Sequence, residues 1–291
     1  MKTLNIIGAG RVGRTLASLW CEKHTFDVKE VLDRKPEGAR AAVAFIGDGT
    51  AVSSIEEMHA ADVWMVTTPD RALVHSADAL VEAGLLRPND IVFHCSGSLP
   101  SSALSAVCNV GAALASVHPL KTFADPREAV RTFVGTYCAV EGDRAALDVL
   151  VPAFERIGGR VSEIDPQGKT IYHAASVIVC NYLTALLEAG LRCYERTGLD
   201  RATATAMIEP IVRETLDNVL ELGTAKALTG PIARGDDTVV AGHLKALDAW
   251  DAHIAAIYRE LGAVALDLAR ARDEADGDAL QRVEAALKHE Q

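Results

Sequence analysis

Three glycines, spaced Gly8-x-Gly10-x-x-Gly13, follow a short apolar run at the start of the chain. Residues 4–7 are typical of a buried strand, and the residues after the glycines carry apolar side chains at helical spacing. A strand, a glycine turn and a helix in this order form the turn that binds the pyrophosphate of a dinucleotide. The glycines permit the tight turn, the approach of the phosphates and the packing of the helix on the strand. We therefore predict a cofactor site that includes Gly8, Gly10, Arg11, Val12 and Gly13.

The end of the next predicted strand carries an acidic and a basic residue. Asp33 stands twenty residues beyond Gly13, where a carboxylate accepts hydrogen bonds from the ribose hydroxyls of NAD. Arg34 follows it, and a guanidinium group at this place binds the 2′-phosphate of NADP. The two neighbours favour different cofactors, so the sequence predicts NADP or NAD and leaves the choice open.

Strand-like and helical patterns alternate through the first half of the chain, which predicts an α/β Rossmann domain with a mostly parallel, doubly wound sheet. The expected strands are residues 4–7, 28–32, 63–67, 91–95, 113–117, 136–140 and 160–163. After Asp165-Pro166 the strand-like runs stop and Ala/Leu-rich helical segments follow, at residues 169–197, 202–222, 239–247 and 251–272. We predict a dinucleotide-binding domain over residues 1–165 and an all-α domain for substrate binding and dimerisation over residues 166–291.

Composition excludes several classes of protein. The net charge of -11 and the lack of a run of Lys or Arg argue against a nucleic-acid-binding surface. No signal-peptide pattern is found, so a cytoplasmic location is expected. Residues 172–191 are the one apolar stretch long enough to span a membrane, but His173, Asn181 and Glu188 lie within it, so we predict a buried core helix and no membrane partner. No metal site is expected.

Loops that follow the predicted strands hold further candidates, because ligands of open α/β sheets bind outside the carboxyl ends of the strands. Thr68 and Pro69 follow the third of the five strands that begin the chain and suit a loop against the nicotinamide ribose. Ser96, after the fourth, is predicted to line the nicotinamide or the substrate. His118 and Lys121, after the fifth, are predicted to bind a substrate carboxylate or carbonyl oxygen.

Polar residues share one face of the helix that begins near Lys169. A turn of about 100° per residue places Lys169, Tyr172, His173, Ser176 and Cys180 on one side of an otherwise apolar helix. Reduction of a C=O or C=N bond needs a proton donor, and Lys169 or His173 can supply one. Tyr172 is predicted to contact the substrate. The alternative is that this face meets solvent or the hinge between domains.

Two residues of the helical half are further candidates for the substrate site. Asn181 lies two turns beyond His173 and is predicted to orient the substrate, with a buried helix contact as the alternative. Arg234 lies between small, flexible residues, where its guanidinium group can pair with a carboxylate or phosphate. Asp236 is expected to cap the helix after it.

With these residues in place, the chain resembles the 6-phosphogluconate-dehydrogenase-like superfamily. The glycine turn, the Thr68-Pro69 strand exit and a helical domain that opens with a lysine-bearing helix carry the resemblance. More closely, the chain is similar to a branch that pairs a Rossmann-like domain with a helical C-terminal domain of unknown function. The residues that carry this closer similarity are His118-Pro119-Leu120-Lys121-Thr122-Phe123, Lys169, Tyr172-His173, Asn181 and Gly230-Pro231-x-x-Arg234-Gly235-Asp236.

Members of this branch are often labelled NADP oxidoreductase, deazaflavin-coenzyme-dependent, and some are similar to ketopantoate reductases. The resemblance implies a Rossmann domain, an NAD(P) cofactor and a homodimer whose helical domains pack together, and it implies no substrate. The spacing of Lys169 and His173 departs from the hydroxyacid dehydrogenases of the superfamily, which have Lys and Asn one turn apart. Their mechanism is therefore not transferred directly.

Two functions are consistent with these residues. The first is an NAD(P)-dependent oxidoreductase that transfers a hydride between the nicotinamide and a small carbonyl, hydroxy-acid or imine substrate. The second is a dinucleotide-binding redox sensor or regulatory protein without catalysis. A cluster of polar side chains near the nicotinamide position favours the enzyme, and an apolar or filled site favours the sensor.

Overall fold

The computed structural model describes residues 1–272 and 274–288. Their contacts group the chain into two units, Met1–Asn181 and Tyr182–Gln291. The sequence placed the domain boundary after residue 165, whereas residues 166–181 group with the first unit. The contacts of the Lys169 helix with the strands therefore lie within one unit.

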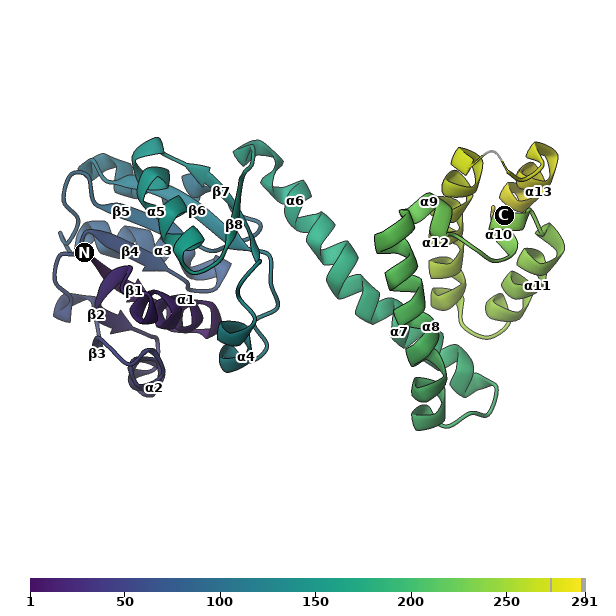
Figure 1. Cartoon of the computed structure of the whole chain (residues 1–291), viewed down its shortest axis with the longest axis horizontal. Coiled ribbons are helices and arrows are strands. Elements are labelled where there is room, and N and C mark those ends of the chain that lie inside the picture. Colours follow the sequence, from purple (N-terminus) through teal and green to yellow (C-terminus); the bar gives the residue numbers. More distant parts are fainter. Residues whose placement is uncertain (273, 289–291) are drawn as a thin grey trace. The chain divides into compact units, whose positions relative to one another are not determined.

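The first unit is built on a single sheet with the strand order β3-β2-β1-β4-β5-β6-β7-β8 (Figure 1). All neighbouring strands are parallel except β6 and β7. The order reverses at β1 and β4, where ligands bind in doubly wound sheets. The predicted fold is confirmed. The strands are β1 Lys2–Ile7, β2 Phe26–Leu32, β3 Thr50–Val52, β4 Val63–Val66, β5 Ile91–His94, β6 Ala113–Pro119, β7 Tyr137–Gly142 and β8 Arg160–Glu163.

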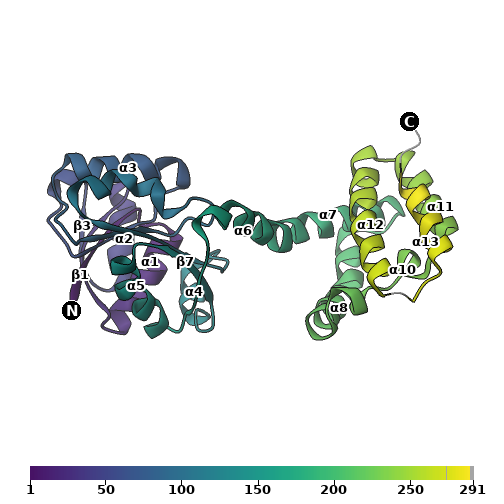
Figure 2. The same cartoon turned by 90° about the horizontal axis from the view of Figure 1, so that it is seen from above.

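Helices cover both faces of this sheet. They are α1 Arg11–Glu22, α2 Pro36–Ile46, α3 Asp70–Glu82, α4 Pro126–Arg131, α5 Arg144–Arg156 and the 3-10 segment η2 Ser101–Val110. Figure 2 shows α3 on the face opposite α1 and α5. On the α1 side, the Trp20 ring packs edge-on against Phe93 and Phe154. On the α3 side, Leu73 and Leu104 belong to a second buried cluster. Both faces are thus sealed by apolar side chains, and the loops at the carboxyl edge remain for function.

Each predicted strand is present, and one strand was not predicted. β3 is three residues long and pairs only with β2 at the edge of the sheet. An alternation of apolar and polar residues needs about four residues to be recognised. The strand was missed because it is too short to show a period.

The described residues after β8 form helices joined by turns, as predicted. α6 (Lys169–Ser176) and α7 (Tyr182–Arg196) are joined by the π-helical turn Val177–Asn181. The helices that follow are α8 Arg201–Leu222, α9 Thr224–Ala227, α10 Pro231–Arg234, α11 Asp237–Asp248, α12 Ala252–Arg272 and α13 Gly277–Leu287. Asp236 accepts a hydrogen bond from the backbone nitrogen of Val239 at 3.3 Å, so its predicted role as a helix cap is confirmed.

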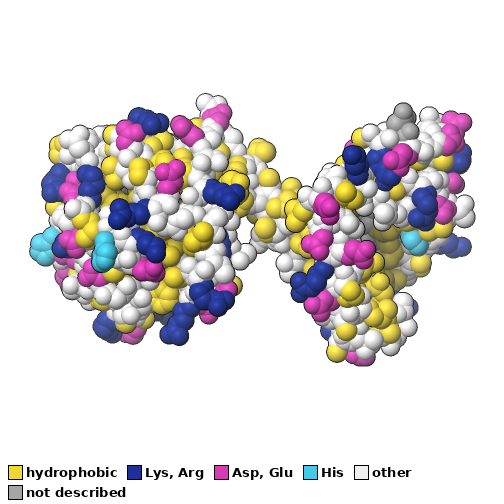
Figure 3. Space-filling view, viewed as in Figure 1, with side chains coloured by type: hydrophobic (Ala, Val, Ile, Leu, Met, Phe, Trp, Pro, Cys, Tyr) yellow, Lys and Arg dark blue, Asp and Glu magenta, His cyan; other side chains and the backbone are white. Residues whose placement is uncertain are grey.

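One prediction about the helical segment is wrong for the single chain. Residues 172–191 were expected to be buried, but only 11% of the apolar window in the run Pro166–Arg196 is buried. Ile171 and Val179 are 75% and 65% exposed, and hydrophobic side chains are visible along this segment in Figure 3. An 18-residue window of this run has a mean hydropathy of 1.5, and the run is long enough to cross a membrane, although one such helix is weak evidence for a span. Apolar surface of this extent normally indicates an interaction site.

Candidate active site

The glycine turn between β1 and α1 packs tightly against the loop after β4. Gly8 has a φ of +92°, and a Cβ atom there would be 2.6 Å from the backbone nitrogen of Thr68. A Cβ atom at Gly13 would be 2.8 Å from the carbonyl oxygen of Gly8 and would overlap the Thr67 side chain. At Gly10 a Cβ atom would meet nothing within 4 Å. Packing therefore requires the first and third glycines, and the second leaves space for a pyrophosphate beside the backbone.

Asp33 braces the same turn from the end of β2. Its Oδ2 atom accepts a hydrogen bond from the backbone nitrogen of Ala9 at 3.1 Å, and its Oδ1 atom accepts one from that of Lys35 at 3.1 Å. The carboxylate thus connects the glycine turn to the loop after β2. Each carboxylate oxygen can accept a second hydrogen bond, which leaves Asp33 able to bind ribose hydroxyls.

A cavity of about 810 Å³ opens over the glycine turn. This volume lies in the usual range for ligand sites, about 300–1,000 Å³. The walls come from the glycine turn, the ends of β2 and β4, and the first turns of α3. The predicted cofactor residues that line it are Gly8, Gly10, Asp33, Arg34, Thr68 and Pro69. The volume of the cavity and its position over the glycine turn both fit a dinucleotide.

Sequence reasoning missed two cationic or titratable residues in this cavity. Arg71 and His75 of α3 line it, and their i, i+4 spacing places them on one face of the helix. That spacing, directly after Thr68-Pro69, was the available signal. The predicted residues Arg11, Val12, Gly13 and Ser96 lie outside the lining. In residues 1–272 and 274–288, no three His, Cys, Asp or Glu side chains gather to hold a metal ion.

Ser96 lies in the loop after β5, which is fastened to the start of α3. Its Oγ atom donates a hydrogen bond to Oδ2 of Asp70 at 2.9 Å, and the Oγ atom of Ser98 donates to the same oxygen at 2.8 Å. Asp70 stands between Pro69 and Arg71, which line the cavity. The loops after β4 and β5 are therefore held together beside the cofactor cavity.

Three predicted substrate or catalytic residues meet at the carboxyl end of β6. The His118 ring is edge-on to the rings of Tyr172 and His173, with centroids 5.6 Å and 5.9 Å apart. The Nδ1 atom of His118 lies 3.1 Å from the Tyr172 hydroxyl oxygen. Burial, together with the nearby His173 and Lys169, lowers the pKa of His118 to about 4, so this ring is neutral near pH 7. We call His118, Tyr172 and His173 the histidine cluster.

Lys169, the first residue of α6, is buried beneath the histidine cluster. Its side chain is 1% exposed, and its Nζ atom donates to Ser116 Oγ and, at 3.3 Å, to Glu141 Oε1. Burial lowers the pKa of Lys169, and the charge of Glu141 opposes this shift. Sequence analysis did not single out Glu141. The half-buried His173 is thus the more accessible of the two predicted proton donors.

The other predicted substrate residues lie in three different settings. Lys121 donates from Nζ to the carbonyl oxygen and Oγ1 of Thr132, at 2.9 Å and 2.8 Å. Asn181 is exposed and ends the π-helical turn. Arg234 is exposed in the second unit and lines a cavity of about 430 Å³ together with Arg272. Only His118 and Tyr172 of the predicted substrate residues touch one another in the first unit.

Two family models match this chain. The Rossmann-like domain matches residues 2–119, and the domain of unknown function DUF2520 matches residues 136–265. The chain belongs to the branch that joins these two domains. The predicted similarity to a branch with these two domains is thereby confirmed. A comparison of this chain with curated proteins finds no match.

Solved structures share the fold over nearly the whole chain. Protein TM1727 from Thermotoga maritima is 26% identical, covers 93% of this chain and 99% of its own, and has a TM-score of 0.74. An imine reductase from Myxococcus stipitatus in complex with NADP+ is 17% identical, with 97% and 99% coverage and a TM-score of 0.65. A pyrroline carboxylate reductase from Plasmodium falciparum with NADP bound is 14% identical, with 99% and 98% coverage and a TM-score of 0.57. At these last two identities the likeness establishes a common fold.

Proposed function

We propose that this protein is an NAD(P)-dependent oxidoreductase that transfers a hydride between the nicotinamide and a small carbonyl, hydroxy-acid or imine compound. One observation carries the proposal. The cavity over the glycine turn and the histidine cluster lie at the same carboxyl edge of the sheet, and only the exit of β5 separates the exit of β4 from that of β6. Ligands of doubly wound sheets bind at this edge. Two of the structural neighbours are reductases whose structures contain NADP, which supports the same class.

The chain's own residues would hold the cofactor along the cavity. Gly8 and Gly10 let the pyrophosphate approach the start of α1, whose free N–H groups favour an anion. Among the residues that line the cavity, Asp33 would hold the adenosine ribose, and Thr68 and Pro69 would hold the nicotinamide end. When bound, the nicotinamide supplies or accepts the hydride.

His173 is the proton donor in this proposal. In the direction of reduction, its protonated ring gives a proton to the carbonyl oxygen or imine nitrogen while the adjacent carbon receives the hydride. Tyr172 and His118, which lie 3.1 Å apart, orient the same oxygen or nitrogen atom. The predicted alternative, Lys169, has both of its protein partners in the interior, and we propose a different role for it below.

The remaining predicted residues are proposed to bind the anionic part of the substrate. Lys121 already has its ammonium group fixed by Thr132, so its charge is held in one place. The exposed Asn181 supplies an amide group. Arg234 belongs to the second unit, where its exposed guanidinium group is proposed to bind an anion. A carboxylate on the substrate is the chemistry that these groups recognise.

We propose NADP as the preferred cofactor. Arg34, Arg71 and His75 all line the cavity, and both oxygens of Asp33 are already engaged by backbone N–H groups. Two guanidinium groups therefore offset one bound carboxylate, which favours the additional charge of a 2′-phosphate.

The polar character of the histidine cluster favours an enzyme over a redox sensor. A sensor has no use for protonatable groups next to the nicotinamide, and apolar side chains would fill this space at lower cost. The Nδ1 atom of His173 is instead buried and lacks a hydrogen-bond partner in the described part of the chain. Such an atom is consistent with a site that completes its hydrogen bonds with a ligand.

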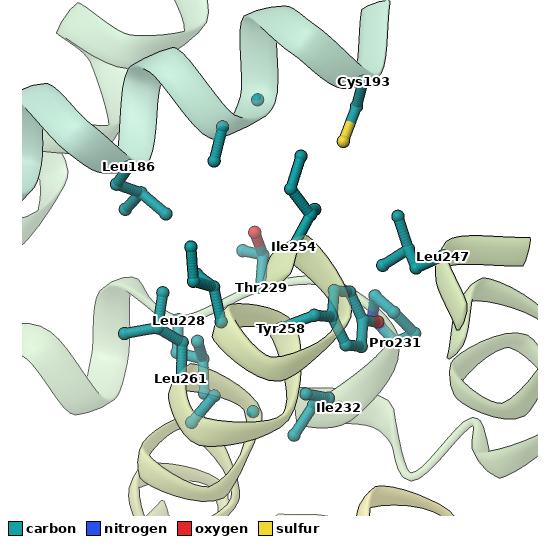
Figure 4. A pocket seen from close by; sticks show the side chains of 15 residues that line it. Leu186, Cys193, Leu228, Thr229, Pro231, Ile232, Leu247, Ile254, Tyr258 and Leu261 are labelled. Atoms are coloured by element: carbon teal, nitrogen blue, oxygen red, sulfur yellow. The ribbon is translucent and has the colours of Figure 1, made fainter. Parts of the chain in front are cut away.

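We also propose that the protein is a homodimer through its helical unit. An apolar cavity of about 340 Å³ lies between α7 and α12, with Leu186 and Cys193 on one side and Ile254 on the other (Figure 4). Ile211 and Leu220 on α8 are 60% and 84% exposed. A second copy of the chain would cover these apolar surfaces. The double substitution Ile211→Glu/Leu220→Glu should dissociate the dimer. Sedimentation of the wild type as a monomer would contradict the proposed dimer.

A cytoplasmic location remains a prediction.

The function is tested first by binding and then by turnover. Calorimetry with NADP(H) and NAD(H) should give tighter binding of the phosphorylated cofactors. Small keto acids and cyclic imines, offered with NADPH, should then be reduced, with loss of cofactor absorbance. His173→Asn should lower turnover about a hundredfold or more and leave cofactor affinity nearly constant. Binding of neither dinucleotide would overturn the proposal.

A further inference from the structure

A row of polar side chains crosses three strands inside the sheet. His94 of β5 pairs in register with Ser116 of β6, and Ser116 pairs with Glu141 of β7. Residues paired in this way on neighbouring strands point their side chains to the same face. His94 and Ser116 are fully buried, and Glu141 is 1% exposed. The row is therefore in the interior, and on β6 it lies two residues before His118 of the candidate active site.

Two further residues bond to the side chains of this row: Lys169 of α6 and Ser101 of η2. Lys169 bonds to both Ser116 and Glu141. The backbone nitrogen of Ser101 donates to Glu141 Oε1 at 2.7 Å, and its Oγ atom donates to Oε2 at 2.6 Å. The carboxylate is thus held by Ser101 of η2 on one side and by Lys169 of α6 on the other.

A buried ion pair of this kind is a poor source of stability. The lost hydration of two charges offsets their attraction, and apolar side chains of similar volume often serve as well or better. The Lys169–Glu141 pair nevertheless stands among fully buried residues, at the base of α6. Its position relative to the histidine cluster offers a reason.

The residues of the histidine cluster lie within a few residues, along the backbone, of Lys169 or of its partner Ser116. Lys169 begins α6, and Tyr172 and His173 follow one turn later. Ser116 is two residues before His118 on β6, so both side chains point to the same face. Any movement of Lys169 relative to Ser116 therefore moves Tyr172 and His173 relative to His118.

We propose that Glu141 is a positioning residue for the reaction: by holding Lys169 in the interior, it fixes the first turn of α6 against β6 and keeps a positive charge beneath the histidine cluster. The inference rests on the proposed function for its catalytic meaning. It concerns Glu141 and Lys169 acting through His118 and His173, and neither of the first two touches the substrate.

The fixed charge has a measurable effect on His118. The titratable groups that face this ring are Tyr172, His173, Lys169 and Asp70. Burial is the main cause of its low pKa, the charges of His173 and Lys169 lower it further, and Asp70 opposes them. Removal of the Lys169 charge should therefore raise the pKa of His118 from about 4 toward the ordinary value of 6.5.

The test uses Glu141→Gln, Lys169→Met and the double variant Glu141→Gln/Lys169→Met in the full chain. Glu141→Gln alone leaves an unpaired buried ammonium group and should lower the melting temperature most. The double variant carries no buried charge at this place, so it should fold as well as the wild type. Lys169→Met alone is the fallback, because a lone buried carboxyl group can take up a proton and become neutral. Asp90→Asn is the control, since Asp90 is also a buried carboxylate and pairs with the half-exposed Arg87 at the other end of β5.

The first readout is the NMR titration of the His118 ring, which needs no substrate. We expect its pKa to rise in the double variant and to stay unchanged in Asp90→Asn. The second readout is turnover with NADPH: kcat should fall about tenfold or more in the double variant, its pH profile should shift to higher pH, and the Kd of NADPH should stay within about twofold.

An unchanged His118 titration in a folded double variant would overturn the inference, even if the melting temperature changes. A shifted titration without any turnover in the wild type would instead contradict the proposed function and leave the electrostatic role of Lys169 intact. A shifted titration with full kcat would show that Glu141 positions nothing that the reaction needs, which also overturns the inference.

Discussion

The His173 ring rests against the Cα atom of Gly97, so closely that a Cβ atom at position 97 would overlap its Nδ1 atom. The same Cβ atom would lie 2.9 Å from Nε2 of His118. Two rings from different elements, β6 and α6, therefore meet over one glycine in the loop after β5. Any side chain at position 97 must push at least one of the rings away.

Gly97→Ala is expected to impair catalysis more than folding. The methyl group displaces His118 and His173 by a fraction of an ångström to about an ångström, and misplacement on this scale can lower turnover about a hundredfold. The Kd of NADPH should change little, because the cofactor cavity is lined by other residues. Steady-state kinetics and calorimetry measure the two effects.

Gly242→Ala is the matched control for this substitution. Gly242 lies within α11, and a Cβ atom there meets nothing within 4 Å. Alanine should raise the stability of that helix by about 0.5–1 kcal/mol and leave kcat unchanged. Equal kcat values in Gly97→Ala and the wild type would contradict a catalytic role for the two histidines.

The three glycines of the turn should respond differently to substitution. Gly10→Val should abolish NADP(H) binding, because the side chain occupies the space that the pyrophosphate needs, while the fold survives because that space is open in the protein alone. Gly13→Val should instead destabilise the protein, because its Cβ atom overlaps Thr67. Calorimetry and thermal unfolding separate the two outcomes. Unaltered cofactor affinity in Gly10→Val would exclude this turn as the pyrophosphate site.

Arg34→Ala should weaken NADP(H) binding about tenfold or more and leave NAD(H) binding nearly unchanged, because the guanidinium group meets only the 2′-phosphate. Arg40→Ala is the control, since Arg40 pairs with Glu37 on the surface of α2 and does not line the cavity. Asp33→Asn should shift the ratio of affinities toward NADP by removal of a negative charge. If neither Arg34→Ala nor Asp33→Asn alters the ratio, the end of β2 does not bind the adenosine ribose.

Much of this arrangement could be predicted from local sequence patterns. The glycine turn and the strands have short-range signatures, because a strand alternates every two residues and a turn needs glycine at set positions. The polar face of α6 was also visible in the spacing of Lys169, Tyr172 and His173. The structure places these side chains at different depths, with Lys169 in the interior and Tyr172 and His173 against His118.

Glu141 could not be identified in the same way. It follows an apolar run that was expected to end at residue 140, so it looked like the first residue of a loop. Its partners Ser101, Ser116 and Lys169 are 25 to 40 residues away, and the antiparallel pairing of β6 with β7 brings Ser116 opposite to it. The burial of the Glu141 carboxylate depends on the register of β7 against β6, which no local sequence pattern predicts. The exposure of the helix over residues 172–191 was missed for a related reason. An apolar sequence predicts that a helix face is covered, but it does not show whether the same chain or another molecule covers it.

Acidification should destabilise the sheet unit through two buried histidines. Burial is the main cause that lowers the pKa of His94 and of His118 to about 4, from an ordinary value of 6.5. Between these values the unfolded chain binds protons that the folded chain does not, so the free energy of unfolding falls as the pH falls from 6.5 to about 4. The contribution is fully present above pH 6.5 and amounts to about 3 kcal/mol for each histidine.

Urea unfolding, followed by the fluorescence of the buried Trp20 and Trp64 at a series of pH values, measures this dependence. The slope should correspond to the uptake of up to two protons on unfolding between pH 6.5 and 4. In His94→Gln the slope should fall by about one proton, because the amide does not titrate. The fold should be kept, since the amide can still donate to the Pro100 carbonyl oxygen, which lies 3.1 Å from Nε2 of His94. His253→Gln, a change at an exposed side chain, should leave the slope as it is. A wild-type free energy of unfolding that stays flat through this range would show that both rings take up their protons in the folded protein, against the burial found for them.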